Sequence, residues 1–363
     1  KFKKLSGVWI MAYTDIDDPS AFFQTKIYTG TDASPQAFTL DGNSDLQPDW
    51  VWIKNRGYAN KHVLFDSVRG VEKSLTTNST AVEVNQNADG GYLSAFNSDG
   101  FTLTEGSGSD NDTNDNRYTY VAWNWKAGSS TSTNTSGNGP DTTINVNQTA
   151  GFSIVTWTGN GDAHTFGHGL GANADFVIVK NREDGSVNAW YVNHISVANT
   201  KALYLNTNAQ ETSDGIWGNS APDSTTFKFD TDNTDDFVAY CFSAKQGYSK
   251  FGSYIGNNNN DGTFVHLGFK PAFVMVKIID TQTDGWIIQD NKRNTTNLAT
   301  SQRLRANTDG AEFSSSNEID LLSNGFKCHG ADGEHNGNGA AYIYMAWAEQ
   351  PFVTSTGVPA TAR

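Results

Sequence analysis

The amino-acid sequence predicts an all-β protein built from three tandem β-sandwich units, each with a jelly-roll or concanavalin-like arrangement of strands. Aromatic residues make up 12% of the chain, and together with many Thr and Val residues they favour strands over helices. Thirty-five glycines and clusters of Asn, Asp, Ser and Thr supply turns. Similar segments recur about once per hundred residues, which indicates a repeated structural unit.

The clearest recurring segment is an apolar run that ends in lysine. It occupies residues 49–54 (DWVWIK), 175–180 (DFVIVK) and 272–277 (AFVMVK). Almost every position in the run is apolar, so alternation cannot place only one face in a core. The run therefore predicts a short strand that is buried on both faces. Its terminal residue is the same in all three units, Lys54, Lys180 and Lys277.

Two further segments mark the beginning and the end of each unit. An opening strand leads into a glycine turn at residues 28–30, 157–161 and 254–257, and an aromatic closing strand covers residues 118–123, 237–242 and 342–347. A weaker echo lies between them, at residues 75–78, 205–208 and 304–307. Together these segments predict six or seven strands per unit, separated by turn signals and without a sustained helical period.

The predicted domain boundaries follow from these markers. Unit one covers residues 1–127, unit two 150–247, unit three 248–352, and a polar tail 353–363. Residues 128–149 are rich in Gly, Ser, Thr and Asn and predict a flexible linker. Units two and three should therefore be held together more rigidly than units one and two. We expect separate aromatic cores with polar joints, and one sandwich assembled from all three units is the less natural alternative.

Charge and hydropathy narrow the function classes. The net charge of −14 and the pI of about 4.8 disfavour nucleic acid as a partner, because an acidic surface repels phosphate. No apolar stretch approaches the length that spans a bilayer, and none is long enough for a signal peptide, although Met11 could be the natural start. Cys241 and Cys328 lie on different predicted strands, so we expect two buried thiols rather than a disulfide.

Two acidic loops are the candidate metal sites. Both precede a closing strand, and their carboxylates are Asp110, Asp112, Asp115, Asp230, Asp232 and Asp235. Dense carboxylate and amide oxygens can surround Ca²⁺, but neither loop has the residue order of an EF-hand. Asx-turns alone would also explain this composition. Calcium is accordingly a candidate ligand and not a required cofactor.

Trp217 is the candidate glycan-binding residue, because it lies in a glycine- and asparagine-rich loop and an exposed ring offers a flat surface to a sugar. The alternative is that this ring, like most Trp in a β-sandwich, belongs to the core. His164, His168 and His266 could form a metal site, but polar residues at strand ends explain them better.

Charged residues also recur after the lysine strand. Asp66 with Arg69 follows the first strand and Asp290 with Arg293 follows the third, whereas unit two has Asn193 and His194. We interpret them as charge pairs that close the end of a sheet. Paired catalytic carboxylates, a nucleophile elbow and a phosphate-binding loop do not stand out, so no enzyme activity is expected.

Several long stretches resemble an uncharacterised domain found in virion and tail-fibre-like proteins of marine tailed bacteriophages. The matching stretches are residues 13–19, 42–54, 150–155, 168–171, 268–274, 322–327 and 342–349. The resemblance covers almost the whole chain from Met11 and implies repeated β units in a virion protein. It supplies no catalytic residues.

The sequence therefore predicts a structural or interaction protein of a phage virion, such as a tail fibre, a capsid decoration or another appendage. Such a protein is made in the host cytoplasm and leaves in the particle. Other virion proteins, further copies of the same chain and a host-surface glycan are the expected partners, without nucleic acid or membrane insertion. A carbohydrate-binding protein is the first alternative, and a polysaccharide-cleaving enzyme is the second.

Overall fold

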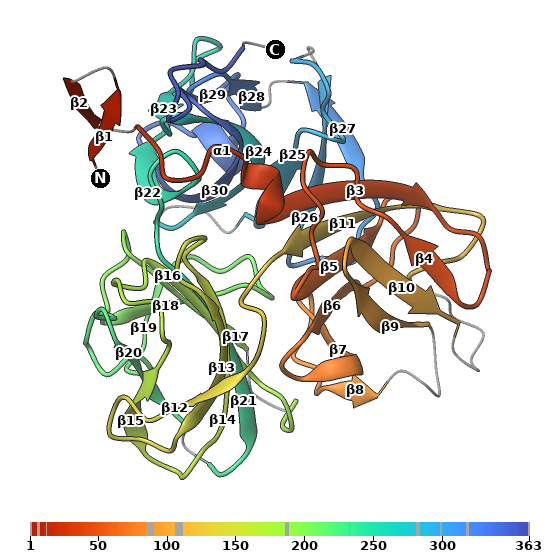
Figure 1. Cartoon of the computed structure of the whole chain (residues 1–363), viewed down its shortest axis with the longest axis vertical. Coiled ribbons are helices and arrows are strands. Elements are labelled where there is room, and N and C mark those ends of the chain that lie inside the picture. Colours follow the sequence, from red (N-terminus) through yellow and green to blue (C-terminus); the bar gives the residue numbers. More distant parts are fainter. Residues whose placement is uncertain are drawn as a thin grey trace.

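The computed structural model describes residues 2–5, 8–11, 13–85, 91–105, 112–185, 189–231, 233–280, 284–297, 300–316 and 319–361. The elements are almost all antiparallel strands (Figure 1), which confirms the predicted all-β class. The described residues form two short helical elements, a 3-10 turn η1 (Pro19–Ala21) and α1 (Gly333–Asn336). A two-stranded hairpin at the N-terminal end consists of β1 (Phe2–Leu5) and β2 (Val8–Met11).

Unit one pairs a six-stranded sheet with a three-stranded sheet. The large sheet has the order β3 (Phe23–Thr29), β11 (Thr119–Trp125), β5 (Trp50–Asn55), β6 (His62–Asp66), β7 (Gly70–Thr76) and β8 (Val84–Asn85). The small sheet has the order β4 (Gln36–Phe38), β10 (Gly100–Thr104) and β9 (Tyr92–Asn97).

Unit two has a larger main sheet of eight strands and a two-stranded partner. The main sheet has the order β12 (Ser132–Asn134), β13 (Thr142–Asn147), β14 (Phe152–Thr158), β21 (Asp236–Phe242), β16 (Phe176–Asn181), β17 (Trp190–His194), β18 (Lys201–Tyr204) and β19 (Thr212–Ser213). The partner consists of β15 (Ala163–Gly167) and β20 (Thr226–Asp230).

Unit three repeats the arrangement of unit one, with a six-stranded and a three-stranded sheet. Its large sheet has the order β22 (Ser249–Ile255), β30 (Ala341–Pro351), β24 (Phe269–Ile278), β25 (Ile287–Asp290), β26 (Thr300–Arg305) and β27 (Phe313–Ser316). Its small sheet has the order β23 (Phe264–His266), β29 (Gly325–Cys328) and β28 (Ile319–Leu322).

The three large sheets share one strand register. In each, the closing strand lies between the opening strand and the lysine strand, as in β3–β11–β5, β14–β21–β16 and β22–β30–β24. Residues of the lysine strand face equivalent residues of the closing strand, namely Trp52 with Trp123, Ile178 with Tyr240 and Met275 with Met345. Residues 120–125, and not 118–123, therefore correspond to 237–242 and 342–347. The register also corrects the weak echo in unit two, because Leu203, and not Leu205, occupies the place of Leu75 and Leu304.

Residues 128–149 are not a flexible linker, contrary to the prediction. β12 and β13 pair with each other, and β13 pairs with β14 along five residue pairs. Alternation explains the difference, since Thr142 and Ile144 point inward while Thr143 is exposed. Ile144 joins the core of unit two, and this burial outweighs the turn-forming composition of the segment.

Each unit has a core between its two sheets. In unit one this core includes Val51, Ile53 and Phe101, and in unit two it includes Val177, Val179 and Phe227. A stacked aromatic pair recurs on the opening and closing strands of every unit, with ring centroids 5.0 to 5.4 Å apart: Tyr28 with Tyr120, Trp157 with Phe237, and Tyr254 with Tyr342.

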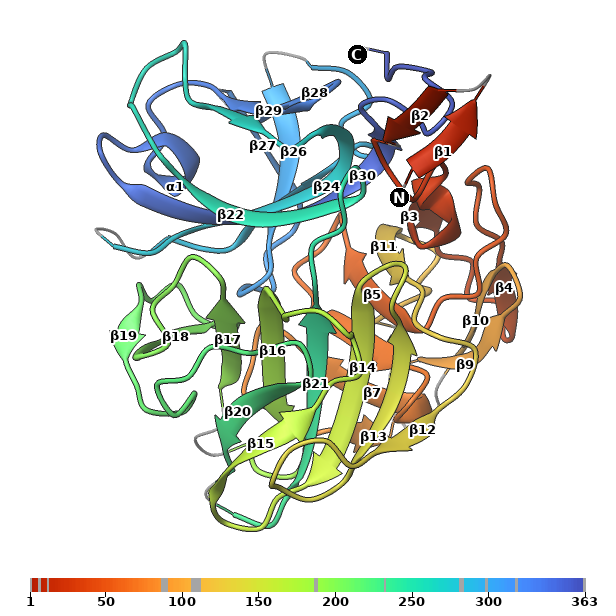
Figure 2. The same cartoon turned by 60° about the vertical axis from the view of Figure 1, so that its left-hand side comes forward.

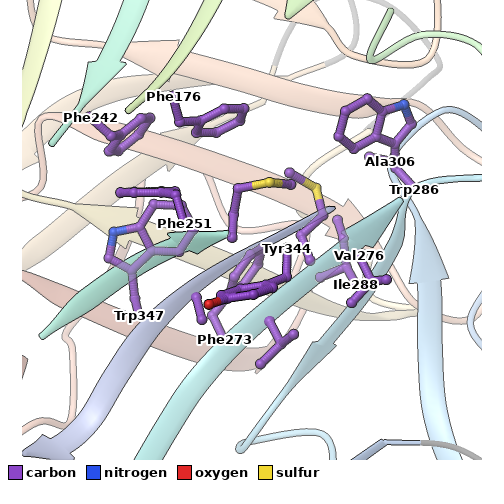
Figure 3. Close-up of a cluster of buried hydrophobic side chains, with 14 of the residues drawn as sticks. Phe176, Phe242, Phe251, Phe273, Val276, Trp286, Ile288, Ala306, Tyr344 and Trp347 are labelled. Atoms are coloured by element: carbon purple, nitrogen blue, oxygen red, sulfur yellow. The ribbon is translucent and has the colours of Figure 1, made fainter. Parts of the chain in front are cut away.

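The opposite faces of the large sheets meet in a second core that all three units share. Figure 2 shows the three units side by side, and Figure 3 shows the part of this core in which Phe176 and Phe242 of unit two lie near Phe251 and Trp347 of unit three. Trp50 of unit one stacks on Tyr240 of unit two, with centroids 4.5 Å apart. Phe242 of unit two contacts Trp347 of unit three at 5.2 Å, and Trp347 contacts Trp125 of unit one at 5.4 Å. The predicted polar joints are therefore wrong, because the large sheets are apolar on both faces and each sandwich buries only one of them.

Candidate functional site

At two of the joints, a tryptophan of one unit donates a hydrogen bond to the backbone of the neighbouring unit. Trp190 of unit two donates its indole N–H to the Thr76 carbonyl of unit one at 2.9 Å. Trp286 of unit three donates in the same way to the Tyr204 carbonyl of unit two at 3.0 Å. The two acceptors occupy the same register position in their sheets. The joints are thus specified by directed hydrogen bonds as well as by apolar packing.

His62 of unit one stands at the position that the two tryptophans occupy. The backbone N–H of each of the three residues donates to an equivalent asparagine, which is Asn78 in the case of His62. Its ring is directed toward the backbone of Arg305 in unit three, but His62 Nε2 makes no hydrogen bond there. Burial holds the pKa of His62 well below its usual range. Because Trp52 donates to His62 Nδ1 at 2.9 Å, the ring is a neutral acceptor there.

Two of the three joints contain a fully buried ion pair. Arg69 contacts Asp66 at 2.5 Å and Arg293 contacts Asp290 at 2.6 Å, and all four side chains are fully buried. Each carboxylate also accepts a hydrogen bond from the neighbouring unit. Tyr240 of unit two donates to Asp66 at 2.8 Å. The predicted charge pairs exist, but they lie within the joints rather than at a sheet end.

The equivalent bond at the other charged joint comes from an indole. Trp123 of unit one donates to Asp290 of unit three at 3.0 Å. Removing the arginine would leave a buried carboxylate without its counter-charge, which is a costly arrangement. These buried pairs therefore hold neighbouring units together, and substitution of either partner is expected to destabilise the joint.

Each buried pair continues into a second pair that crosses the joint. Glu83 of unit one contacts its own Arg69 at 3.1 Å and Arg182 of unit two at 2.9 Å. The backbone N–H of Glu83 also donates to the Arg182 carbonyl. At the other joint the same chain comprises Asp290, Arg293, Glu312 and Arg56, with Arg56 to Glu312 at 2.7 Å. Four alternating charges thus link neighbouring units at two joints.

At the joint between units two and three, which we call the neutral joint, a histidine stands in the place of the buried ion pair. His194 takes the register position of Asp66 and Asp290, and burial lowers its pKa to about 4. Ser196 donates to His194 Nδ1, so the proton is on Nε2, which faces the Tyr344 carbonyl of unit three at 3.2 Å. The buried Val197 stands three residues on, where the other units have arginine.

The three recurring lysines are buried hydrogen-bond donors. Lys54, Lys180 and Lys277 are fully buried, and each ammonium donates to the carbonyl of the following residue at 2.6 to 2.8 Å. Burial lowers the pKa of each lysine to about 8. Lys277 also donates to the Asn208 carbonyl of unit two at 3.1 Å. The repeated lysine therefore fastens the loop after each lysine strand.

Trp217 is not an exposed ring, so the prediction that it offers a surface to a sugar is wrong. Its side chain is 1% exposed and packs in the core of unit two. The ring meets Phe229 edge to face, with centroids 5.3 Å apart. The polar composition of the loop suggests an exposed ring, but a tight turn from Asp214 to Gly218 directs the ring into the core.

The described acidic side chains of the two loops have protein partners. Asp115 binds Arg117, which holds the pKa of the carboxyl below its usual range. Asp235 accepts from Asn181 at 2.8 Å, and Asp112 and Asp230 are also engaged in interactions. Asp110 and Asp232 lie outside the described residues. Among the residues that are described, no three His, Cys, Asp or Glu side chains gather as metal ligands, so calcium stays a prediction.

The three histidines considered as a metal site have different surroundings. His164 lies beside Asn160, while His168 is buried, accepts from the Leu170 N–H and faces the Asp223 carbonyl. His266 is exposed on β23. Cys241 and Cys328 are both buried and are not joined in a disulfide, as predicted.

The fold and its joints define a β-sandwich protein in which three similar units pack around a common core. A family model described as a domain of unknown function, DUF7483, matches residues 18–351. The chain belongs to this family, and the match includes parts of all three units. No curated protein and no solved structure matches the chain. Within the described ranges, no helix is long and apolar enough to cross a membrane.

Proposed function

We propose that this chain is a structural and interaction protein of a bacteriophage virion, placed in a tail fibre, a capsid decoration or another appendage. The observation that carries the proposal is the common core, which joins three similar sandwiches into one body. Such a body holds the loops and sheet edges of all units at fixed spacing, and this suits a protein that makes simultaneous contacts with several neighbours.

The charged joints support the same role. The Asp–Arg–Glu–Arg chain begins with a fully buried pair. It fixes the orientation of neighbouring units more narrowly than apolar packing alone, because its buried charges need their partners. The resemblance of long sequence stretches to virion and tail-fibre-like proteins supports the location. Other virion proteins and further copies of the chain are the proposed partners, together with the host surface.

The proposal is tested by asking whether the protein is part of purified particles. Phage particles from an infected culture are banded on a density gradient, digested and analysed by mass spectrometry, and the intact particles are labelled with immunogold antibodies. We expect the protein in the particle band and gold on an appendage or on the capsid. Recovery only in the soluble lysate, with bare particles, would contradict a virion role.

The carbohydrate-binding alternative has lost Trp217 as its candidate residue. A pocket at the joint of units one and three offers a different site. No observation on the described residues favours the polysaccharide-cleaving alternative, and we do not propose it.

A further inference from the structure

A pocket of about 210 Å³ opens at the joint between units one and three. One wall consists of the consecutive residues Phe23, Gln24 and Thr25 on β3, and the loop 41–43 continues it. The opposite wall comes from unit three and includes Ala272 and Glu349. Because β3 is the outer strand of its sheet, the pocket lies along a sheet edge.

The joint between units one and two shows what fills the corresponding space there. β14 is the counterpart of β3, and β13 runs along its outer side. Asn145 of β13 donates to Asp49 at 3.1 Å, and Asp49 also accepts from the Ala127 N–H at 2.8 Å. The added strand and the carboxylate together occupy that joint.

Both of these groups are missing beside β3. Among the described residues, β3 has no strand on its outer side. Ala272 stands at the position of Asp49, immediately before the apolar run of its lysine strand. The pocket is therefore a specific departure from the repeated design, confined to the joint that lacks both the strand and the carboxylate.

Thr25 supplies an independent sign that the pocket has an occupant. Its side chain is 3% exposed, and Oγ1 has no hydrogen-bond partner. Among the unpaired buried polar atoms of the described residues, this is the one whose residue lines the pocket. The equivalent residues are apolar, Ile154 in unit two and Phe251 in unit three. A buried hydroxyl without a partner is costly, so a ligand hydroxyl would satisfy it.

Both carboxylates that line the pocket are paired with lysines. Asp41 contacts Lys292 at 2.8 Å and Lys26 at 3.3 Å, and Glu349 contacts Lys270 at 3.2 Å. Asn291 donates to Glu349 at 2.9 Å, which fixes the orientation of both side chains. Neither lining carboxylate is thus left without a counter-charge, and the walls still offer donors and acceptors, which favours a neutral ligand whose hydroxyl groups both donate and accept.

The size and the apolar part of the walls narrow the ligand further. At about 30 Å³ per water, the volume equals roughly seven waters, which is close to that of one hexose. Phe23, Ala272 and Ala348 contribute apolar atoms that can cover the C–H groups of a sugar ring. We propose that this pocket binds one neutral hexose unit of a glycan, with a sugar hydroxyl bonded to Thr25. The proposal goes beyond the virion role and does not depend on it.

The test uses the full chain and saturation-transfer NMR with glucose, galactose and mannose, each at about 50 mM, since a single small pocket is expected to bind in the millimolar range. Three variants are compared: Ala272→Asp, which restores the carboxylate found in unit one; Thr25→Val, which removes only the hydroxyl; and Thr29→Val, a matched change at an exposed position of β3. Thermal melts establish that each variant is folded.

We expect transfer to at least one hexose, its loss in Ala272→Asp, and binding weakened about two- to tenfold in Thr25→Val, the effect of one hydrogen bond. Thr29→Val should bind like the native chain. No transfer from the native protein to any of the three sugars would overturn the proposal, and so would equal transfer from folded Ala272→Asp.

Discussion

Single residues decide how tightly neighbouring units are joined. Asp66 and Asp290 each combine an arginine of their own unit with a donor from the next. His194 performs the equivalent task without charge, because burial keeps its pKa at about 4. Two charged joints and one neutral joint are therefore built on the same strand position.

Arg69→Met removes the counter-charge of a buried carboxylate. We expect this change to destabilise the folded chain by about 3 kcal/mol, the usual cost of breaking such a pair. Chemical denaturation followed by tryptophan fluorescence measures it. The control is Arg117→Met, whose guanidinium is exposed and which should leave the midpoint unchanged. Equal effects of the two substitutions would contradict the role of the buried pair.

The buried lysines predict a dependence on alkaline pH. Their folded pKa of about 8 lies below the usual value of 10.5, so between these values the unfolded chain binds more protons and stability rises with pH. Buried tyrosines and Cys241, whose pKa values are raised, act in the opposite direction. The effect of one lysine must therefore be isolated by substitution.

Lys180→Met isolates that effect. The free energy of unfolding of the native chain should rise relative to the variant by about 1–2 kcal/mol between pH 8 and pH 9.5. Denaturation curves at both pH values measure the difference. A difference that does not change with pH would show that Lys180 is not charged and buried as described.

At the scale of elements, β12 and β13 show which strands a sequence pattern can predict and which it cannot. The apolar runs identified the lysine strands because their pattern is continuous. Residues 128–149 have the composition of a linker, because the alternation of Thr142 and Ile144 is short and lies among turn formers. Composition alone cannot show that a neighbouring strand has an unpaired edge. The sequence could not predict the pocket beside β3 either, because the pocket exists only where no further strand pairs with the outer edge of β3.

Hydrogen exchange tests the strand assignment of this segment. The β13 amides that bond β14 should exchange slowly, at a rate comparable to that of amides in β14. Mass spectrometry of peptides covering residues 140–148 measures this protection. Exchange as fast as that of an unstructured peptide would contradict the strand assignment and support a flexible linker.

The neutral joint predicts an acid response. The folded pKa of His194 is about 4, below the usual value of 6.5, so the unfolded chain binds the extra proton first and stability falls as pH drops from 6.5 to 4. His194→Gln keeps an N–H donor near the Tyr344 carbonyl and does not titrate. The native chain should lose about 2 kcal/mol relative to this variant between pH 6.5 and pH 4.5, as measured by thermal melts. Parallel losses would contradict the assignment.

At the scale of the whole molecule, the common core shows that the three repeated units form one body. The sequence showed that the lysine strands are buried on both faces, but not what covers the second face. Trp50, Phe242 and Trp347 belong to different units, and their contacts depend on how the sheets are oriented. Local patterns therefore predicted the units, and only the assembled structure shows that they form one body.

Calorimetry of the full chain tests this central claim most directly. Because the three units share a core, they should unfold in one cooperative transition, with a calorimetric enthalpy equal to the van't Hoff enthalpy. Arg69→Met should shift that single transition to lower temperature without splitting it. Separate transitions for the three units, with only one of them shifted by the substitution, would contradict the account.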